Sequence, residues 1–142
     1  MWFLQYILCI FLFLYLPVSA INFEEEFPKY FAECNSNDAT KVDLDAVAKA
    51  KSGQKFNPEQ LSSYLNCMFT KFGIQDNNGD YNQQKVKEFI KHIVSDQGNV
   101  DTIITNCAIR PEGSTAKSAA LNLLVCPAKY DKLRYPSLNR QS

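Results

Sequence analysis

The chain has 142 residues, of which 46% are hydrophobic and 21% are charged, and its 15 basic and 15 acidic residues give a formal net charge of zero. Because no basic block could follow a phosphate backbone or an anionic membrane surface, the composition argues against nucleic acid as a partner. The length suits one domain that buries roughly two-thirds of its unfolded surface.

Residues 1–20, MWFLQYILCIFLFLYLPVSA, are predicted to be a secretory signal peptide. They contain no charged residue, are mostly apolar up to Pro17, and end in the small residues that a signal peptidase accepts. No Lys or Arg precedes the apolar run, and a membrane anchor is the alternative because such a segment is just long enough to span a bilayer. Pro17 and the small residues favour cleavage after Ala20. Cleavage would leave a secreted, extracellular domain of residues 21–142 that does not insert into membranes.

The first expected helix lies in NFEEEFPKYFAEC. Its aromatic residues share one side, namely Phe23, Phe27, Tyr30 and Phe31. Pro28 is expected to kink or restart this helix because proline has no backbone N–H. A short helix follows in DLDAVAKA, with Leu44 and Val47 as its apolar residues.

Residues 58–72 have the spacing of one apolar helix face. The apolar positions are Leu61, Tyr64, Leu65, Met68, Phe69 and Phe72, at i, i+3, i+4, i+7, i+8 and i+11. Asn57 is a good N-cap, Pro58 occupies the first helical position, and Gly73 is placed to end the helix. The start and stop signals therefore agree with the periodicity.

Three more amphipathic helices are expected, at 82–96, 99–109 and 115–126. Their apolar residues are Val86, Phe89, Ile90, Ile93 and Val94, then Val100, Ile103, Ile104, Cys107 and Ala108, then Ala116, Ala119, Ala120, Leu123 and Leu124. The apolar stripe of the last helix extends beyond one face, so we expect this helix to be the most buried. No segment alternates for long enough to predict a strand. The sequence thus predicts an all-α fold, a compact bundle of about six helices.

Four cysteines remain if Cys9 leaves with the signal peptide: Cys34, Cys67, Cys107 and Cys126. An even number in an oxidising compartment is typical of two disulfides. Four cysteines allow three pairings, among which the residues alone do not choose.

The order and context of these cysteines resemble those of insect odorant-binding proteins of the pheromone-binding and general odorant-binding superfamily. The resemblance covers the whole mature chain, including the segment CMFTKFGIQDNNGDYN and the late cysteine pair. The usual family pattern has six half-cystines, with the second four positions before the third and the fifth nine before the sixth. Ser63 and Lys117 stand at those positions, so both members of one bridge are absent together. This matches the four-cysteine Minus-C subclass.

The resemblance implies the pairs Cys34–Cys67 and Cys107–Cys126, and helices that enclose an apolar cavity for a small hydrophobic ligand. The absent bridge would join the third expected helix to the sixth. Its absence predicts looser coupling at that junction, with full compensation by packing as the alternative.

Candidate ligand-binding residues follow from the apolar faces and from the tail at residues 130–142. They are Tyr64, Met68, Phe69, Phe72, Phe89, Ile90, Ile93, Ile104, Ala108, Ala119, Ala120, Leu123, Leu133 and Tyr135. Flat rings and a flexible thioether accommodate ligands of varied shape, although any helical core needs the same stripes. Micromolar binding requires about 8 kcal/mol, and a buried methylene contributes about 0.8 kcal/mol. Ligands of about ten or more carbons, or compact aromatic or terpenoid molecules, are therefore expected.

In related proteins the segment after the last cysteine can cover or enter the cavity. Here Leu133, Tyr135 and Leu138 would be the inserting groups, and a frayed polar terminus is the alternative. The hydroxyls of Tyr64 and Tyr135 are candidates for hydrogen bonds to an alcohol, ester or aldehyde head group.

The remaining motifs predict neither metal nor catalytic chemistry. His92, the one histidine, falls opposite the apolar stripe of its helix and is expected at the solvated surface, rather than as a pH-dependent release switch. One histidine and four disulfide-bonded cysteines leave no metal ligand set. The segment DNNGD departs from the EF-hand spacing and is read as a turn. No catalytic motif or cofactor-binding motif occurs, so no enzyme activity and no cofactor are predicted.

The predicted function is a secreted carrier of small hydrophobic molecules, acting as a monomer or weak homodimer, with a membrane olfactory receptor as a possible further partner. The alternative is a secreted helical protein of the same fold that acts through protein contacts in venom, saliva or reproductive fluid.

Overall fold

The computed structural model describes residues 20–51 and 54–134. The expected signal peptide up to residue 19 and the tail residues from 135 onward, with Tyr135 and Leu138, lie outside the described residues. Within the described ranges the helices are α2 (Phe23–Asn35), α3 (Leu44–Lys51), α4 (Pro58–Lys71), α5 (Gln83–Ile93), the 3-10 helix η1 (Gln97–Asn99), α6 (Val100–Cys107) and α7 (Ala116–Ala128). Extended pairing there is limited to two isolated antiparallel bridges. The prediction of an all-α bundle with about six helices is confirmed.

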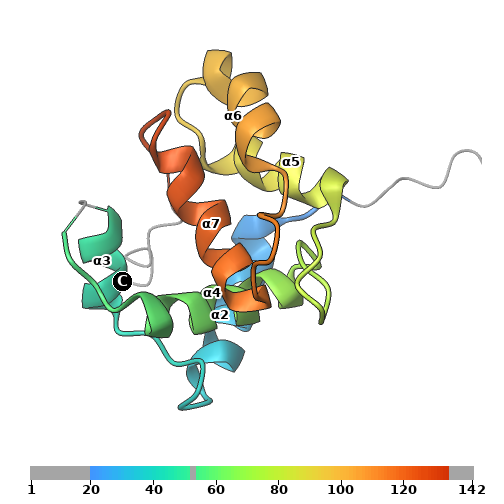
Figure 1. The fold of residues 1–142 in the computed structure, drawn as a ribbon. Coiled ribbons are helices and arrows are strands. Elements are labelled where there is room, and N and C mark those ends of the chain that lie inside the picture. The colour runs from blue at the N-terminus through green and yellow to red at the C-terminus, as the bar shows by residue number, and fades with distance from the viewer. Residues whose placement is uncertain (1–19, 52–53, 135–142) are drawn as a thin grey trace, which may run out of the picture.

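Helix α4 is the centre of the bundle. It packs against α2 and α7, while α6 packs against α7 and α5, as the arrangement in Figure 1 shows. Seven residues of α4 are buried, compared with five of α7. The expectation that the last helix is the most buried is therefore wrong. Two neighbouring helices cover α4, whereas Lys117 and Ser118 of α7 are exposed.

The ends of α4 follow from local sequence. The side chain of Asn57 accepts hydrogen bonds from the backbone N–H groups of Glu59 and Gln60, at 3.0 and 3.4 Å. At the other end Gly73 adopts a φ of 70°, which a residue with a Cβ rarely adopts. The N–H of Ile74 then donates to the carbonyl of Phe69 at 2.8 Å, so the last turn is closed. Both predicted boundaries of this helix are confirmed.

Helix α2 continues through Pro28 as a single helix, so it does not restart there. The missing N–H of Pro28 removes one helical hydrogen bond. Phe23, before that position, and Tyr30 and Phe31, after it, pack in or against the core. In α3, which follows, Val47 packs against the core but Leu44 is 49% exposed.

Helix α5 ends at Ile93, three residues earlier than the periodicity predicts. Val94 is extended and forms an antiparallel bridge with Leu133. The guanidinium of Arg134 donates to the carbonyls of Val94 and Ser95, at 3.2 and 2.9 Å. A segment about 40 residues later in the chain therefore sets this helix end, which explains why the local pattern misplaces it.

The start of α7 is fastened to the loop after α4. The buried side chain of Gln75 donates from Nε2 to the carbonyls of Gly79 and Ala116, at 3.2 and 3.1 Å. The hydroxyl of Tyr81 donates to the carbonyl of Ala119 at 2.7 Å, and burial raises the pKa of Tyr81 to about 12. A Cβ added at Gly79 would lie 2.6 Å from Cα of Ala116, so the two segments approach too closely for any larger residue.

Arg110 adds a second connection at the same end of α7. Its guanidinium donates to the carbonyl of Asn78 at 3.0 Å and to the carboxylate of Asp80 at 2.7 Å. It also donates to the carbonyl of Ser114 at 2.7 Å. The segment DNNGD is thus a turn, closed by hydrogen bonds to Asp76 and tied by Arg110 to the turn before α7.

Candidate functional site

Aromatic rings from α2, α4 and α5 form one connected group in the interior. The ring of Phe23 lies 5.2 Å from that of Phe72 and 6.0 Å from that of Phe89, between centroids. Phe69 and Phe89 meet edge to face at 4.9 Å, and Tyr30 meets Phe72 in the same way at 5.0 Å. Such geometries are the favoured ones for aromatic pairs. We call these five residues the aromatic cluster.

Tyr64 lies on the same helix as Phe69 and is 6% exposed. Its ring contacts Phe31 of α2 edge to face, at 6.1 Å between centroids. Burial raises the pKa of the Tyr64 hydroxyl above its ordinary value. Within residues 20–51 and 54–134, no group forms a hydrogen bond with this hydroxyl. The hydroxyl oxygen is not among the buried side-chain atoms that lack a partner, so solvent reaches it and it can still donate and accept hydrogen bonds.

The structure brings most of the predicted site residues into one hydrophobic core. The buried members are Tyr64, Met68, Phe69, Phe72, Phe89, Ile90, Ile93, Ala108, Ala120 and Leu123. Ile104 and Leu133 are partly buried and pack against them. Ala119 is also buried, with its carbonyl bonded to Tyr81. Tyr135 lies outside the described residues.

Residues of α2 were missing from the predicted site. Phe23 and Tyr30 belong to the aromatic cluster, and Phe31 covers Tyr64. Their shared side of the helix was visible in the sequence, and that periodic pattern was the signal that could have found them. The pattern does not say which helix they face, and the packing of α2 against α4 supplies that information.

His92 is less exposed than its predicted place at the solvated surface implies. It is partly buried, and its ring stacks on that of Phe23 at 4.8 Å between centroids, with an interplanar angle of 22°. The prediction of a surface position is met only in part, because Phe23 at the start of α2 covers one side of the imidazole ring. A helical pattern within α5 alone does not reveal such a cover.

Two amide oxygens within the described chain are buried without a hydrogen-bond partner, Oδ1 of Asn66 and Oε1 of Gln75. Each of these oxygens can accept a hydrogen bond from a water molecule or from another donor. No cluster of three or more His, Cys, Asp or Glu side chains in the described ranges is arranged to hold a metal ion. No helix in those ranges is both long and apolar enough to cross a membrane.

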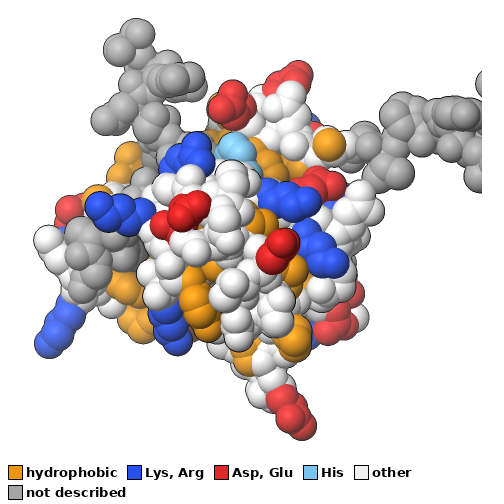
Figure 2. Space-filling view, turned by 90° about the horizontal axis from the view of Figure 1, so that it is seen from above, with side chains coloured by type: hydrophobic (Ala, Val, Ile, Leu, Met, Phe, Trp, Pro, Cys, Tyr) orange, Lys and Arg blue, Asp and Glu red, His pale blue; other side chains and the backbone are white. Residues whose placement is uncertain are grey.

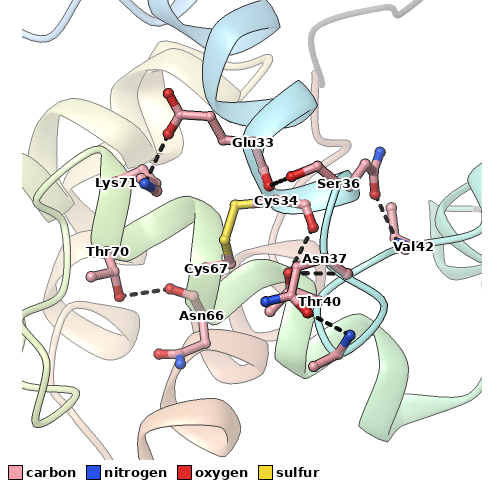
Figure 3. Close-up of a disulfide and its surroundings, with 12 residues drawn as sticks. Glu33, Cys34, Ser36, Asn37, Thr40, Val42, Asn66, Cys67, Thr70 and Lys71 are labelled. Carbon is pink, nitrogen blue, oxygen red and sulfur yellow. Dashed lines mark hydrogen bonds and ion pairs between the residues drawn. A yellow bond between two sulfur atoms is a disulfide. The ribbon is translucent and has the colours of Figure 1, made fainter.

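The two disulfides have the expected pairing. Cys34–Cys67 joins α2 to α4 with Cα atoms 6.0 Å apart, and Cys107–Cys126 joins α6 to α7 with Cα atoms 5.7 Å apart. Figure 3 shows the first bridge and its surroundings.

An ion pair lies beside the first bridge and connects the same two helices. The ammonium group of Lys71 lies 2.8 Å from the carboxylate of Glu33, and this hydrogen bond lowers the pKa of Glu33 (Figure 3). At the positions of the absent family bridge, Ser63 is buried and its hydroxyl donates to the carbonyl of Glu59, while Lys117 is exposed. Helix α4 packs directly against α7 without that bridge.

The surface carries both signs of charge. On the face shown in Figure 2, acidic and basic side chains are interspersed among uncharged groups. This agrees with the formal net charge of zero.

The described helices thus form a small disulfide-linked α-helical bundle around an interior rich in aromatic rings. A sequence model of the PBP/GOBP family matches residues 20–130. The chain belongs to this family, within the insect odorant-binding protein superfamily. The family is one of secreted binding proteins rather than enzymes. No solved structure was found to match the chain.

Proposed function

We propose that the protein is a secreted carrier that binds small hydrophobic molecules, such as odorants, pheromones or similar lipophilic ligands, in an internal cavity and transports them through aqueous fluid. Family membership supports the binding of small hydrophobic ligands. The observation that carries the proposal for this chain is the aromatic cluster, in which rings from separate helices meet in the interior.

The ligand would lie among the candidate residues of α4, α5, α6 and α7, with the aromatic residues of α2 as a further wall. Rings and aliphatic side chains favour an apolar ligand body because both lose water-exposed area on contact. The carrier would act without catalysis as a monomer or weak homodimer of the Minus-C subclass, and a membrane olfactory receptor would be a further partner. Localisation outside the cell fits the two disulfides.

Displacement of a bound fluorescent dye tests the carrier function. Secreted protein is expected to bind the apolar dye N-phenylnaphthylamine, and apolar volatiles of about ten or more carbons should displace it. Denatured protein with its disulfides reduced provides the baseline for nonspecific dye binding. Indifference to every such ligand, together with tight binding of a macromolecule, would contradict the proposal and favour a protein-contact function.

The Tyr64 hydroxyl is proposed to bind the polar head of the ligand. Tyr64→Phe should weaken binding of a long-chain alcohol by up to about tenfold, because a net hydrogen bond contributes about 0.5–1.5 kcal/mol. Binding of the matching alkane should not change. Stability should also remain unchanged, since the hydroxyl bonds no described residue. Competition titrations with the dye measure both affinities.

Tyr81→Phe is the matched control for this experiment. Its hydroxyl already bonds the carbonyl of Ala119, so its removal should lower stability by about 1 kcal/mol and leave the alcohol-to-alkane affinity ratio unchanged. An equal loss of alcohol and alkane binding in Tyr64→Phe would show that the hydroxyl does not bind the head group.

The tail is proposed to cover the bound ligand. Leu133 packs against the core, and Arg134 ties this segment to the end of α5. Deleting residues 130–142 should therefore speed dissociation of the dye severalfold, as measured by stopped-flow fluorescence. A shorter deletion, of residues 135–142, keeps Leu133 and Arg134. It therefore separates the contribution of these two residues from that of Tyr135. If the dye dissociates from both deletion variants at the same rate as from the full-length protein, the tail does not cover the ligand.

A further inference from the structure

A hydrogen bond connects the segment before α2 to the middle of α5. The backbone N–H of Ile21 lies 3.1 Å from Oε2 of Glu88, 67 residues later in the chain. Nε2 of Gln84 lies 3.4 Å from the other carboxylate oxygen. Glu88 is partly buried, and the side chain of Ile21 packs against the core. Ile21 is therefore positioned by contacts on both its backbone and its side chain.

The sequence predicts cleavage immediately before this nitrogen. Hydrolysis of the Ala20–Ile21 peptide bond would leave a carboxylate on Ala20 and an α-amino group on Ile21. An α-amino group has an ordinary pKa of about 7.7–8.0, so at pH 7 it is mostly an ammonium group with three donors. Ala20 is exposed, so its removal leaves no buried gap. One neutral N–H would thus be replaced by a cation at hydrogen-bond distance from a carboxylate.

We propose that removal of residues 1–20 creates an ion pair between the α-ammonium group of Ile21 and the carboxylate of Glu88, which fastens the start of α2 onto α5. The residues that follow hold Ile21 in place. The side chain of Asn22 caps α2, and the buried ring of Phe23 contacts those of Phe72 and His92. This inference rests on the predicted cleavage and is independent of the carrier function.

The α-ammonium group of Ile21 would lie at the N-terminus of α2, where it needs a nearby negative charge such as that of Glu88. A positive charge at the N-terminus of a helix is unfavourable, because the helix dipole places partial positive charge there. Near the new ammonium group, the charged and titratable side chains in the first turn of α2 and within one turn of Glu88 on α5 are Glu24, Glu25, Glu26, Lys85, Lys87, Lys91 and His92. Glu88 is the carboxylate already within hydrogen-bond distance of the nitrogen.

A double-mutant cycle tests the ion pair. The full chain is secreted from a eukaryotic host, and N-terminal sequencing is expected to begin at Ile21. A second form carries Gly-Ser inserted after Ala20, so that the nitrogen of Ile21 is again a neutral amide. Both forms are made with Glu88 and with Glu88→Gln, and their unfolding in urea is compared at pH 7. Glu88→Gln also changes the hydrogen bond from Gln84, but it does so in both forms, so this change cancels when the two effects are subtracted.

Glu88→Gln should raise the unfolding equilibrium constant about tenfold more in the chain that begins at Ile21 than in the extended chain. Tenfold corresponds to a pKa shift of one unit, or about 1.4 kcal/mol. Equal effects in both forms would overturn the proposal, as would a mature chain that begins at another residue. Glu112→Gln, at an exposed carboxylate before α7, is the control and should show no difference between the two forms.

A direct titration provides a second measurement. The rate of acylation of the Ile21 amine as a function of pH should give a pKa above 7.7–8.0 in the unextended protein and a lower value in Glu88→Gln. A raised pKa in the folded state means that the stabilisation is present below about pH 8 and is lost as the pH rises through the raised value. An amine pKa that is the same in both proteins would overturn the proposal.

Discussion

Replacing Cys34 and Cys67 together by alanine is expected to lower the free energy of unfolding by about 4 kcal/mol. The bridge closes a loop with a sequence separation of 33 residues, and its removal increases the conformational entropy of the unfolded chain. Alanine is the suitable replacement because Cys34 is buried, and two free thiols or hydroxyls would add an unrelated polar effect. Urea unfolding followed by circular dichroism measures the change.

The second bridge provides the matched comparison. Its loop has a separation of 19 residues, so alanine at both Cys107 and Cys126 should lower the free energy of unfolding by about 3 kcal/mol. Because small domains are stable by about 5–15 kcal/mol in total, either variant should remain measurable at low temperature. A larger loss from the shorter loop would contradict the loop-entropy explanation. It would instead point to the local contacts of α6 and α7.

The second large effect is expected at Phe89. Its ring contacts Phe23 and Phe69, and its side chain is 8% exposed. Phe89→Ala should lower the free energy of unfolding by about 3–5 kcal/mol, because it removes buried apolar area and leaves a void in the aromatic cluster. Thermal and urea unfolding measure this loss.

The void also makes a binding prediction. Benzene should raise the melting temperature of Phe89→Ala more than that of the unmodified protein, since an apolar void accepts an apolar ligand of matching size. Tyr130→Ala removes an exposed aromatic ring, 43% exposed, and is the control. It should change stability by less than about 0.5 kcal/mol and show no added response to benzene. Loss of stability at Phe89 without any benzene effect would mean that the surrounding helices collapse into the space.

Local signals predicted α4 well because its boundaries depend on nearby residues. Asn57 caps its first turn, and Gly73 supplies the left-handed conformation that closes its last turn. The end of α5 could not be predicted in this way, because Val94 leaves the helix to pair with Leu133. The disulfide pairing came from the spacing pattern of the family, since the cysteines alone allow three arrangements.

The candidate site was predictable to the extent that it consists of apolar helix faces. The periodicity placed Tyr64, Phe69 and Phe89 on the inward sides of their helices, and the structure buries all three. It did not place Phe23 against Phe89, or His92 on Phe23, because those contacts join separate helices. Contacts between helices depend on tertiary packing, which a single-helix period does not encode.

The hydrogen bonds from Gln75, Tyr81 and Arg110 to the region around the start of α7 have a kinetic consequence. Protein segments held by noncovalent contacts open and close within microseconds to seconds, whereas an uncatalysed disulfide rearranges over minutes to hours. We therefore expect this end of α7 to detach and return many times while both bridges stay intact. In hydrogen exchange, the first turn of α7 should open at similar rates in oxidising and mildly reducing buffer.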